Sequence, residues 1–437
     1  MSIVIFCILN TKSHHLSTFR LANELQKKGH EVAYVGPDSM KNFIESNNFT
    51  FIENDHKLIS SPVDVHLKRS KEIFKEFVRD YKHNDPFEGV FKRVKPDLML
   101  LDTSYLHYNF HVKKHGVSVM HAQTMLPLEK QKNVPPINSE VVPKNTFWSK
   151  MKIEMLWQKY FLRRRMKFFR NLAKHKTDEL LLIKEKLANS QEAGNQVITK
   201  DRFLHYGLSN VPEIVFPPNE FNFPYEAKQN QFFLGFKDQW HSGYIPAAKK
   251  NYDEKKAQVE AKPIIYCSFG TLSKGDVVLD FFYRLIDASE SFPEYHFVLS
   301  GGNMYSYFSK EKLANFPENV FLFEFVPQVD ILQRTALMIT HGGVNSVMEC
   351  ILNEVPMLVV PLVDWLDQPG NAARVLYHSL GLRGNIKKET ADSLRMKMRA
   401  ILEDGDCRVN IRNMKNRILS SPSYEQTVDY ITSQIKA

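Results

Sequence analysis

The sequence predicts an α/β protein made of two similar halves, each organised around a parallel sheet. Short continuous apolar runs, typical of strands buried on both faces, alternate with segments of helical periodicity. This alternation stops once, in a polar stretch rich in Lys and Ala at 239–262, and then begins again. The 437 residues suffice for two domains with separate cores. We therefore expect two Rossmann-like domains, 1–238 and 263–437, joined by a linker at 239–262.

The first half begins with a strand and a helix in the order that such a domain requires. Residues 3–9 form a continuous apolar run, and 16–28 carry apolar residues on one helical face, followed by Gly29 as a C-cap. The glycine pattern of dinucleotide-binding proteins does not follow the first strand, so a nicotinamide cofactor is not expected. Further strands are expected at 31–35, 96–101 and 117–121.

The segment 148–187 differs from its surroundings because it is long, helical and strongly basic. Ten Lys and Arg stand against one acid between residues 148 and 176, with large apolar and aromatic residues interleaved. One interpretation is a helix on an anionic membrane surface. The other is a helix pair with apolar residues in the core and solvated cations. We expect the first; no recognised motif indicates nucleic acid as a partner.

The second half repeats the strand–helix rhythm and ends in helices. Strands are expected at 264–269, 295–300, 320–325, 336–340 and 355–360, and a helix at 277–289. Three helices are expected in the tail, at 390–403, 407–419 and 423–435. Between the first two, Asp404-Gly405-Asp406 has the spacing of a metal-chelating pair, but a glycine turn far from any ligand loop is the better interpretation. No metal is expected.

Cysteine usage and charge indicate the compartment. Cys7, Cys267, Cys350 and Cys407 are far apart and show no metal spacing, which favours buried free thiols in a reducing cytosol. The first apolar run is short and no cation precedes it, so it predicts a strand rather than a signal peptide. No stretch reaches the length of a membrane span. The net charge of +9 favours anionic partners. We expect a cytoplasmic protein, associated peripherally with the inner membrane through 148–176.

The stretch 325–371 carries the strongest chemical signal. The apolar run 336–340 stops at His341-Gly342-Gly343, and a helix can begin at Val344. A strand, a glycine turn and a helix N-terminus form an anion site, because unpaired amides and the helix dipole point at the same place. Asn345 and Ser346 add side-chain donors there, and His341 adds a ring nitrogen.

Two groups of polar residues flank this turn. Glu349 lies one turn beyond Asn345 on the same helix face, where its carboxylate can bind a ribose diol. Asp364, Asp367 and Gln368 follow the next strand at its carboxyl end, where open α/β sheets bind ligands. The sequence therefore predicts a site for a diphosphate with a ribose on one side and a polyhydroxyl group on the other.

The run HGGVNSVMEC, with the later DQPGNAARV, resembles the donor-site signature of nucleotide-sugar-dependent glycosyltransferases of the plant natural-product, UDP-glucuronosyl and macrolide type. The resemblance implies a GT-B fold, in which two Rossmann-like domains face each other across a cleft and the last helix packs back on the first domain. It also implies a UDP-sugar donor and a small hydroxylated acceptor, with no cofactor beyond these substrates.

The resemblance assigns the donor contacts. Phe325, Val326 and Gln328 match the aromatic-x-Pro-Gln loop, whose ring stacks on uracil and whose backbone reads the base; thymine stays an alternative. Gly270 and Thr271, at a strand-to-helix turn, are expected at the phosphates, together with His341, Gly343, Asn345 and Ser346. Asp367 and Gln368 match the pair that binds the donor sugar, although an Asp before Pro369 is also an ordinary helix cap.

The same resemblance places a catalytic pair in the first half. Counting back from Gly29-His30-Glu31-Val32 puts His14 at the position of the catalytic histidine. Asp102, at the end of the expected strand LMLLD, resembles the family's partner aspartate. Ser13 and Ser17 replace the family's frequent glycine and proline, and His15 adjoins, so the register can shift by one residue.

We thus expect an inverting transferase that moves a hexose, from UDP-glucose, to a hydroxyl of a small hydrophobic acceptor, with His14 as the general base. Acceptor loops are expected at 60–82 and 124–146. Two alternatives are a nucleotide-sugar epimerase or hydrolase of similar fold, and a non-catalytic basic membrane-binding protein.

Overall fold

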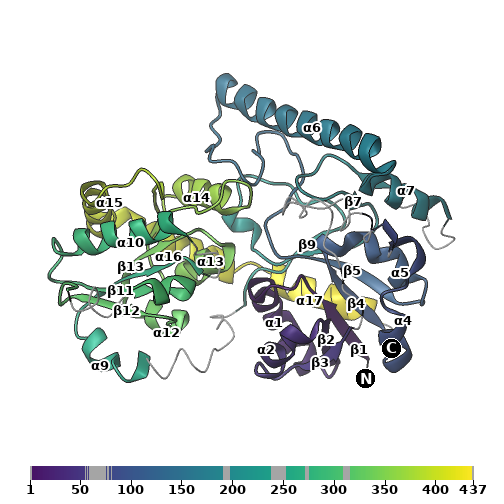
Figure 1. Ribbon diagram of the computed structural model, residues 1–437, viewed down its shortest axis with the longest axis horizontal. Helices are drawn as coiled ribbons and strands as arrows, with labels where there is room; N and C mark the ends of the chain where they lie inside the picture. Colours follow the sequence, from purple (N-terminus) through teal and green to yellow (C-terminus); the bar gives the residue numbers. More distant parts are fainter. Residues whose placement is uncertain are drawn as a thin grey trace.

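The computed structural model describes residues 2–54, 56, 58, 75, 78–79, 81–189, 197–237, 252–270, 275–308 and 315–435. Two separate parallel sheets lie side by side, each flanked by helices (Figure 1). The expected fold class, two Rossmann-like α/β domains, is confirmed.

The N-terminal sheet has seven parallel strands, with β1 and β4 at its centre. Every residue of β4 is buried, as are the last four residues of β1. Ile5 on β1 lies opposite Ala33 on one neighbour and Met99 on the other. In spatial order the strands are β3 (Thr50–Glu53), β2 (Glu31–Gly36), β1 (Ile3–Cys7), β4 (Leu98–Asp102), β5 (Ser118–Gln123), β8 (Glu213–Val215) and β9 (Gln231–Phe233).

Helices and short elements complete this domain. The helices are α1 (Lys12–Lys27), α2 (Lys41–Glu45), α4 (Glu88–Arg93) and α5 (Asn109–Lys113), with 3-10 turns η1 (Asp38–Met40), η3 (Thr103–Tyr108) and η5 (Asn219–Phe221). A small antiparallel pair is formed by β6 (Ile198–Thr199) and β7 (Gly207–Leu208).

The basic segment 148–187, which the sequence predicts to be helical, forms two successive helices. They are α6 (Phe147–His175) and α7 (Glu179–Asn189). The break comes at Lys176, which takes a left-handed conformation with φ of 60°. Two residues later, Asp178 accepts a hydrogen bond from the backbone N–H of Leu180 and so starts α7. The prediction that this segment is helical is therefore confirmed, with a break between the two helices.

The C-terminal sheet has six parallel strands, five of them expected from the sequence. The sixth, β15, was not expected. In spatial order they are β12 (Val320–Phe323), β11 (His296–Ser300), β10 (Ile264–Ser268), β13 (Thr335–Thr340), β14 (Met357–Val359) and β15 (Gly381–Arg383). The helices and the 3-10 turn here are α9 (Lys256–Val259), α10 (Asp276–Ser289), η7 (Gly302–Tyr307), α12 (Gln328–Leu332), α13 (Val344–Leu352), α14 (Gln368–Tyr377), α15 (Ala391–Glu403) and α16 (Gly405–Leu419).

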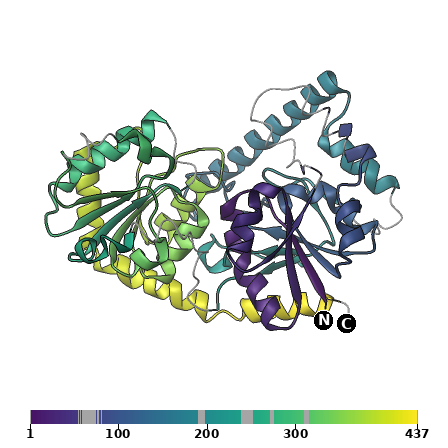
Figure 2. The ribbon, with the colours of Figure 1, turned by 60° about the horizontal axis from the view of Figure 1, so that its bottom comes forward.

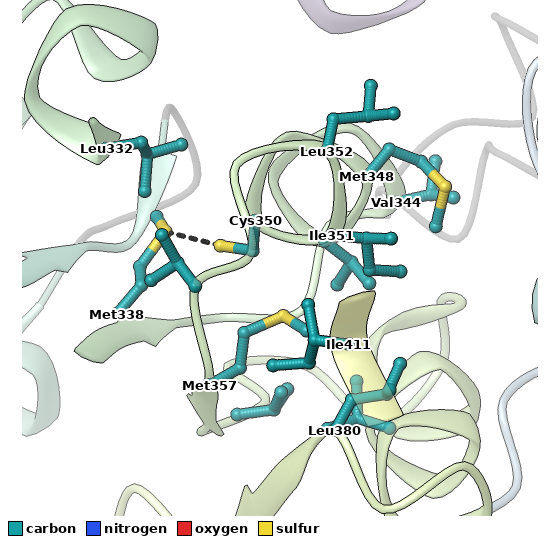
Figure 3. Close-up of a cluster of buried hydrophobic side chains, with 14 of the residues drawn as sticks. Leu332, Met338, Val344, Met348, Cys350, Ile351, Leu352, Met357, Leu380 and Ile411 are labelled. Atoms are coloured by element: carbon teal, nitrogen blue, oxygen red, sulfur yellow. Dashed lines mark hydrogen bonds between the residues drawn. The ribbon is translucent and has the colours of Figure 1, made fainter. Parts of the chain in front are cut away.

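An apolar cluster fixes α13 against this sheet (Figure 3). Met348, Ile351 and Leu352 are buried, and the Cys350 thiol contacts the Met338 sulfur on β13 at 3.1 Å. The cysteines at 7, 267, 350 and 407 are all buried and unpaired. The position of the α13 N-terminus is therefore set by core packing rather than by a loop.

The chain crosses between the domains at two places. Part of the expected linker, 239–251, lies outside the described residues; beyond it, Tyr252 and Val259 are fully buried in the C-terminal core. After α16 the chain returns, and α17 (Ser423–Gln434) packs along the N-terminal domain (Figure 2). Thr427 donates a hydrogen bond to the Phe233 carbonyl at 2.8 Å. Within the described parts of the chain, no helix is long and apolar enough to cross a membrane.

Candidate active site

The N-termini of α1 and α13 meet between the two domains. The Asn345 amide donates a hydrogen bond to the Ser13 carbonyl at 2.8 Å, and its oxygen accepts one from the Ser17 hydroxyl at 2.9 Å. Ser13 and Ser17 flank His14 on the first turns of α1. This bridge therefore brings the residues around His14 next to the glycine turn of the second domain.

His14 and Asp102 form a hydrogen-bonded pair at the carboxyl edge of the N-terminal sheet. The Nδ1 atom of His14 lies 3.0 Å from the Asp102 carboxylate and 2.9 Å from the Thr124 hydroxyl. Asp102 is buried and also accepts hydrogen bonds from the backbone N–H groups of Leu9 and Ser104. Burial raises the pKa of Asp102, but the nearby His14 charge and these hydrogen bonds outweigh it and leave the pKa below its usual value. An ionised Asp102 can hold the ring and stabilise an imidazolium.

His15 lies in a different environment from its neighbour. Its ring is buried, packs near Tyr34 and Phe43, and bonds through Nδ1 to the Thr11 carbonyl at 3.0 Å. Burial lowers the pKa of His15 to about 4. Of the two adjacent histidines, only His14 has the Asp102 partner.

The glycine turn leads into α13 with no side-chain cap on its first amides. Gly343 is the N-cap residue, and Gly342 has φ of +86°. A Cβ atom added to Gly343 would lie 2.6 Å from His341 Nε2, and one on Gly270 would lie 3.0 Å from its Cε1. The His341 ring is thus in contact with both glycines. Burial lowers its pKa to about 4, so His341 is neutral near pH 7 and presents one N–H donor. Thr271 lies outside the described residues.

A polar network joins α13 to the loop before α12. The Gln328 amide donates to the Ser346 hydroxyl at 3.1 Å and also to the buried Glu349 carboxylate. Phe325, in the same loop, is exposed, whereas Val326 is buried. This loop and the Glu349 face therefore lie together, as a base-and-ribose site requires. The sequence did not predict that Gln328 reaches Glu349.

Asp367 and Gln368 lie at the start of α14. Asp367 does not cap this helix; its carboxylate accepts a hydrogen bond from Asn371 at 2.9 Å. Burial raises the pKa of Asp367, and the charge of His14 acts in the opposite direction. The Gln368 oxygen accepts the backbone N–H groups of Leu362 and Val363, at 2.8 and 3.2 Å, and fixes the loop after β14.

Sequence reasoning missed a second contact between the domains. The buried Arg374 guanidinium donates to the Asn222 side-chain oxygen at 2.8 and 3.0 Å and lies over the Phe223 ring. Burial lowers the pKa of Arg374 to about 9. A Cβ on Gly370 would lie 1.7 Å from the Ile137 carbonyl oxygen, so the expected acceptor loop 124–146 packs directly on α14. No local pattern signals either contact, since the partners lie far apart in sequence.

The Asp404-Gly405-Asp406 triplet lies away from these residues. Asp404 caps α16 by accepting the backbone N–H of Cys407 at 3.1 Å, and the helix itself begins at Gly405. The expected glycine turn is therefore a helix start. Among the residues that the structure describes, no three His, Cys, Asp or Glu side chains are grouped to hold a metal ion.

Comparison with known proteins identifies the class. Residues 305–433 match the family model described as Erythromycin biosynthesis protein CIII-like, C-terminal domain. The chain is 28% identical over 233 residues to NDP-glycosyltransferase YjiC of Bacillus licheniformis, covering 51% of this chain and 56% of that one. It is 32% identical over 145 residues to zeaxanthin glucosyltransferase of Pantoea ananas, 33% and 32% of the two chains. The chain spans about half, or less, of the length of these curated relatives.

Solved structures resemble the whole chain. The glycotransferase of kitacinnamycin has a TM-score of 0.70 at 16% identity, covering 100% of this chain and 99% of that one. The spinosyn forosaminyltransferase SpnP has a TM-score of 0.67 at 17% identity, covering 99% of both. The fold is GT-B. The similarity to the EryCIII-like C-terminal domain over 305–433 and to NDP-glycosyltransferase YjiC over about half of the chain confirms the resemblance seen in the sequence.

Proposed function

We propose that the protein is an inverting glycosyltransferase that moves a hexose from a UDP-sugar, with UDP-glucose preferred, to a hydroxyl group of a small lipophilic acceptor. One observation carries the proposal. The His14–Asp102 pair lies beside the uncapped N-terminus of α13, because Asn345 on that helix bonds to Ser13 and Ser17 on either side of His14. A base and a diphosphate site on opposite domains are what a single displacement at an anomeric carbon requires.

In the proposed reaction, His14 acts as the general base. Because the oxygens of Asp102 and Thr124 both lie within hydrogen-bond distance of Nδ1, the ring proton belongs on Nδ1 and Nε2 can accept a proton. Nε2 removes the proton of the acceptor hydroxyl while its oxygen attacks the anomeric carbon. The bond from that carbon to the diphosphate breaks, and UDP leaves with the electron pair. Attack opposite the leaving group inverts the anomeric centre.

The donor contacts follow from the arrangement around α13. The amides after Gly343 and the N–H of His341 stabilise the departing diphosphate, with Asn345, Ser346 and Gly270 beside it. Glu349 binds the ribose diol and Gln328 orients it. Phe325 stacks on the base, uracil in preference to thymine, and the Val326 backbone reads its edge. Asp367 and Gln368 bind the hexose hydroxyls.

The acceptor side is apolar, which supports a lipophilic acceptor. Leu16 and Met125 adjoin His14 and Thr124 in sequence and pack, only partly buried, against the cluster that contains Trp157 and Leu126. One relative, zeaxanthin glucosyltransferase, is named for a carotenoid acceptor. We place the reaction on the cytoplasmic side of a membrane, in keeping with the four buried free thiols.

The test is UDP release from UDP-glucose with and without a panel of lipophilic alcohols, with the product anomer assigned by NMR. TDP-glucose run in parallel compares the two bases. Release that needs the acceptor and gives the inverted anomer supports the proposal; release or isomerisation without acceptor indicates a hydrolase or epimerase instead.

The His14→Ala variant tests the base. We expect its rate to fall by about 10²- to 10⁴-fold while UDP binding stays unchanged in calorimetry. His15→Gln, which keeps a polar group near the Thr11 carbonyl, is the matched control. Full activity in His14→Ala together with loss in His15→Gln would contradict the assignment.

A further inference from the structure

The helix α6 has two separate apolar faces. On the inner face, Ile153 and Trp157 are buried, and the Trp157 indole donates to the Val134 carbonyl at 2.8 Å. Arg164 lies on this side too and donates to the Arg202 carbonyl at 2.8 Å. These contacts attach α6 to the body of the N-terminal domain and account for part of its apolar residues. The remaining apolar residues need another explanation.

The outer face carries an exposed apolar stripe, formed by residues seven apart. Successive residues of such a set are offset by about 20° around a helix, so the four lie within an arc of about 60°. Over 21 residues the stripe is about 32 Å long. Seven of the 16 large hydrophobic side chains that are exposed in the described chain lie on α6, so this is a patch and not ordinary scatter. The stripe consists of Trp148, Met155, Leu162 and Phe169, exposed by 72, 60, 59 and 61%.

Cations run along one side of the stripe. Lys152, Lys159, Arg163 and Arg170 are all exposed. The single acid of α6, Glu154, is paired with Lys130 at 2.7 Å. At the C-terminal end of α6 this row of cations leads to a cavity of about 390 Å³ with a basic lining. Its lining includes Lys75, Arg79, Lys82, His83, Lys174 and Lys176.

The charge decides which occupant fits this surface. An antiparallel second copy of α6 would place one row of cations against the other. A parallel copy would offer the cations no row of acids, because Glu154 is the single acid of α6, so the charge opposes self-association through the stripe. An anionic bilayer satisfies both features, because the apolar side chains can enter the acyl boundary while Lys and Arg contact the lipid phosphates. The helix lies at the margin of the molecule, clear of both sheets (Figures 1 and 2).

We infer that α6 lies along the surface of an anionic membrane, with Trp148, Met155, Leu162 and Phe169 inserted between the headgroups and the cationic flank bound to lipid phosphates. The binding does not depend on the proposed reaction. It does have a consequence for that reaction, because the inner face of α6 packs on the apolar cluster near Thr124, so a membrane-dissolved acceptor would meet the protein close to His14.

The test is flotation of the full chain with vesicles of phosphatidylcholine alone or mixed with phosphatidylglycerol. We expect co-flotation with the mixed vesicles at low salt. Met155→Gln combined with Leu162→Gln should weaken partitioning by about tenfold or more. Met396→Gln on α15, where the side chain is 67% exposed, is the matched control and should bind as the parent does. Arg163→Gln with Arg170→Gln should weaken it too, whereas Lys387→Gln with Lys388→Gln should not.

Fluorescence separates insertion from surface adsorption. Brominated lipids should quench the emission of the membrane-bound protein, and Trp148→Phe should remove most of that quenching. Retained UDP binding in every variant shows that each is folded. Absence of co-flotation, equal loss in the Met396 control, or a dimer that forms without lipid and is disrupted by Leu162→Gln would overturn the inference; the last would assign the stripe to a second copy.

Discussion

Adjacent side chains on a helix point about 100° apart, and this separates the two histidines at the start of α1. His14 bonds to Asp102, whereas His15 packs against Tyr34 and Phe43 in the core. The sequence indicates a catalytic histidine here but leaves its register open, because Ser13 and Ser17 replace the family's usual residues. The structure gives these two serines a purpose of their own: the Ser13 carbonyl and the Ser17 hydroxyl bond to Asn345.

Substitutions at Glu349 and Asp367 should divide the donor site into two parts. Glu349→Ala should weaken binding of UDP and of UDP-glucose alike, by about 1.5–3 kcal/mol, because the ribose is common to both ligands. Asp367→Ala should weaken UDP-glucose only, because its carboxylate is assigned to the hexose. Isothermal titration calorimetry with both ligands measures this directly. Equal losses for both ligands in both variants would contradict the division.

At the scale of the element, the glycine turn before α13 is set by backbone geometry and by close packing together. Gly342 has φ of +86°, and a Cβ there would lie 2.7 Å from Val359 Cγ1 and 3.2 Å from the Gln368 carbonyl oxygen. Gly275, which precedes α10, has the same φ of +86°, but a Cβ there meets nothing within 4 Å. A substitution at Gly275 therefore measures backbone strain alone, whereas one at Gly342 measures backbone strain together with steric overlap.

We expect Gly275→Ala to lower the free energy of unfolding by about 1–3 kcal/mol, because its backbone, with φ of 86° and ψ of 166°, lies in a region that essentially only glycine adopts. Gly342→Ala should lower it further and should also weaken UDP binding, because the overlap with Val359 and Gln368 displaces the first amides of α13. Urea denaturation and calorimetry on both variants provide the comparison. Similar stability and intact UDP binding in the two variants would show that the turn tolerates displacement.

Most of the strands were predictable, whereas β3, β8 and β9 of the N-terminal sheet and the contacts between elements were not. Apolar runs gave the bounds of β1, β4, β10 and β13 to within two residues, because strands buried on both faces have no polar residue to obscure them. The short strand β15 escaped notice because its three residues are only partly buried. The donor-site residues that the spacing indicates stay a prediction. Thr124 at His14 and Asn222 at Arg374 come from distant segments, and no local pattern reports them.

On the scale of the whole molecule, the buried histidines should make the protein sensitive to acid. Burial lowers the pKa of His15 to about 4, and burial with the neighbouring Arg202 charge lowers that of His121 and of His205 to about 3. Below the usual pKa of about 6.5 the unfolded chain takes up protons that the folded chain does not. The contribution is therefore complete above pH 6.5 and declines as the pH falls toward 4.

The free energy of unfolding should accordingly be lower near pH 5 than near pH 7, by about 1.4 kcal/mol per pH unit for each such histidine. Urea denaturation at the two pH values measures the difference. Carboxylates of lowered pKa, such as Asp102, stabilise the folded protein equally at pH 7 and pH 5. Their stabilisation is lost only as the pH falls below their usual pKa near 3.8. A stability that stays level between pH 7 and pH 5 would show that the buried histidines open to solvent without unfolding.

The position of α17 has a consequence for movement of the domains. The chain leaves the N-terminal domain after Lys237 and has entered the C-terminal core by Tyr252; it returns between Leu419 and Ser423. The return segment ends in a helix whose Tyr430 ring stacks on Phe232 at 3.8 Å. Two connecting segments restrain rotation of one domain relative to the other far more than one segment does. Only a rotation about an axis that passes near both segments leaves the two segments unstretched. Movement of one domain relative to the other should therefore follow one axis, and a movement that separates α1 from α13 must break the hydrogen bonds of Asn345 with Ser13 and Ser17.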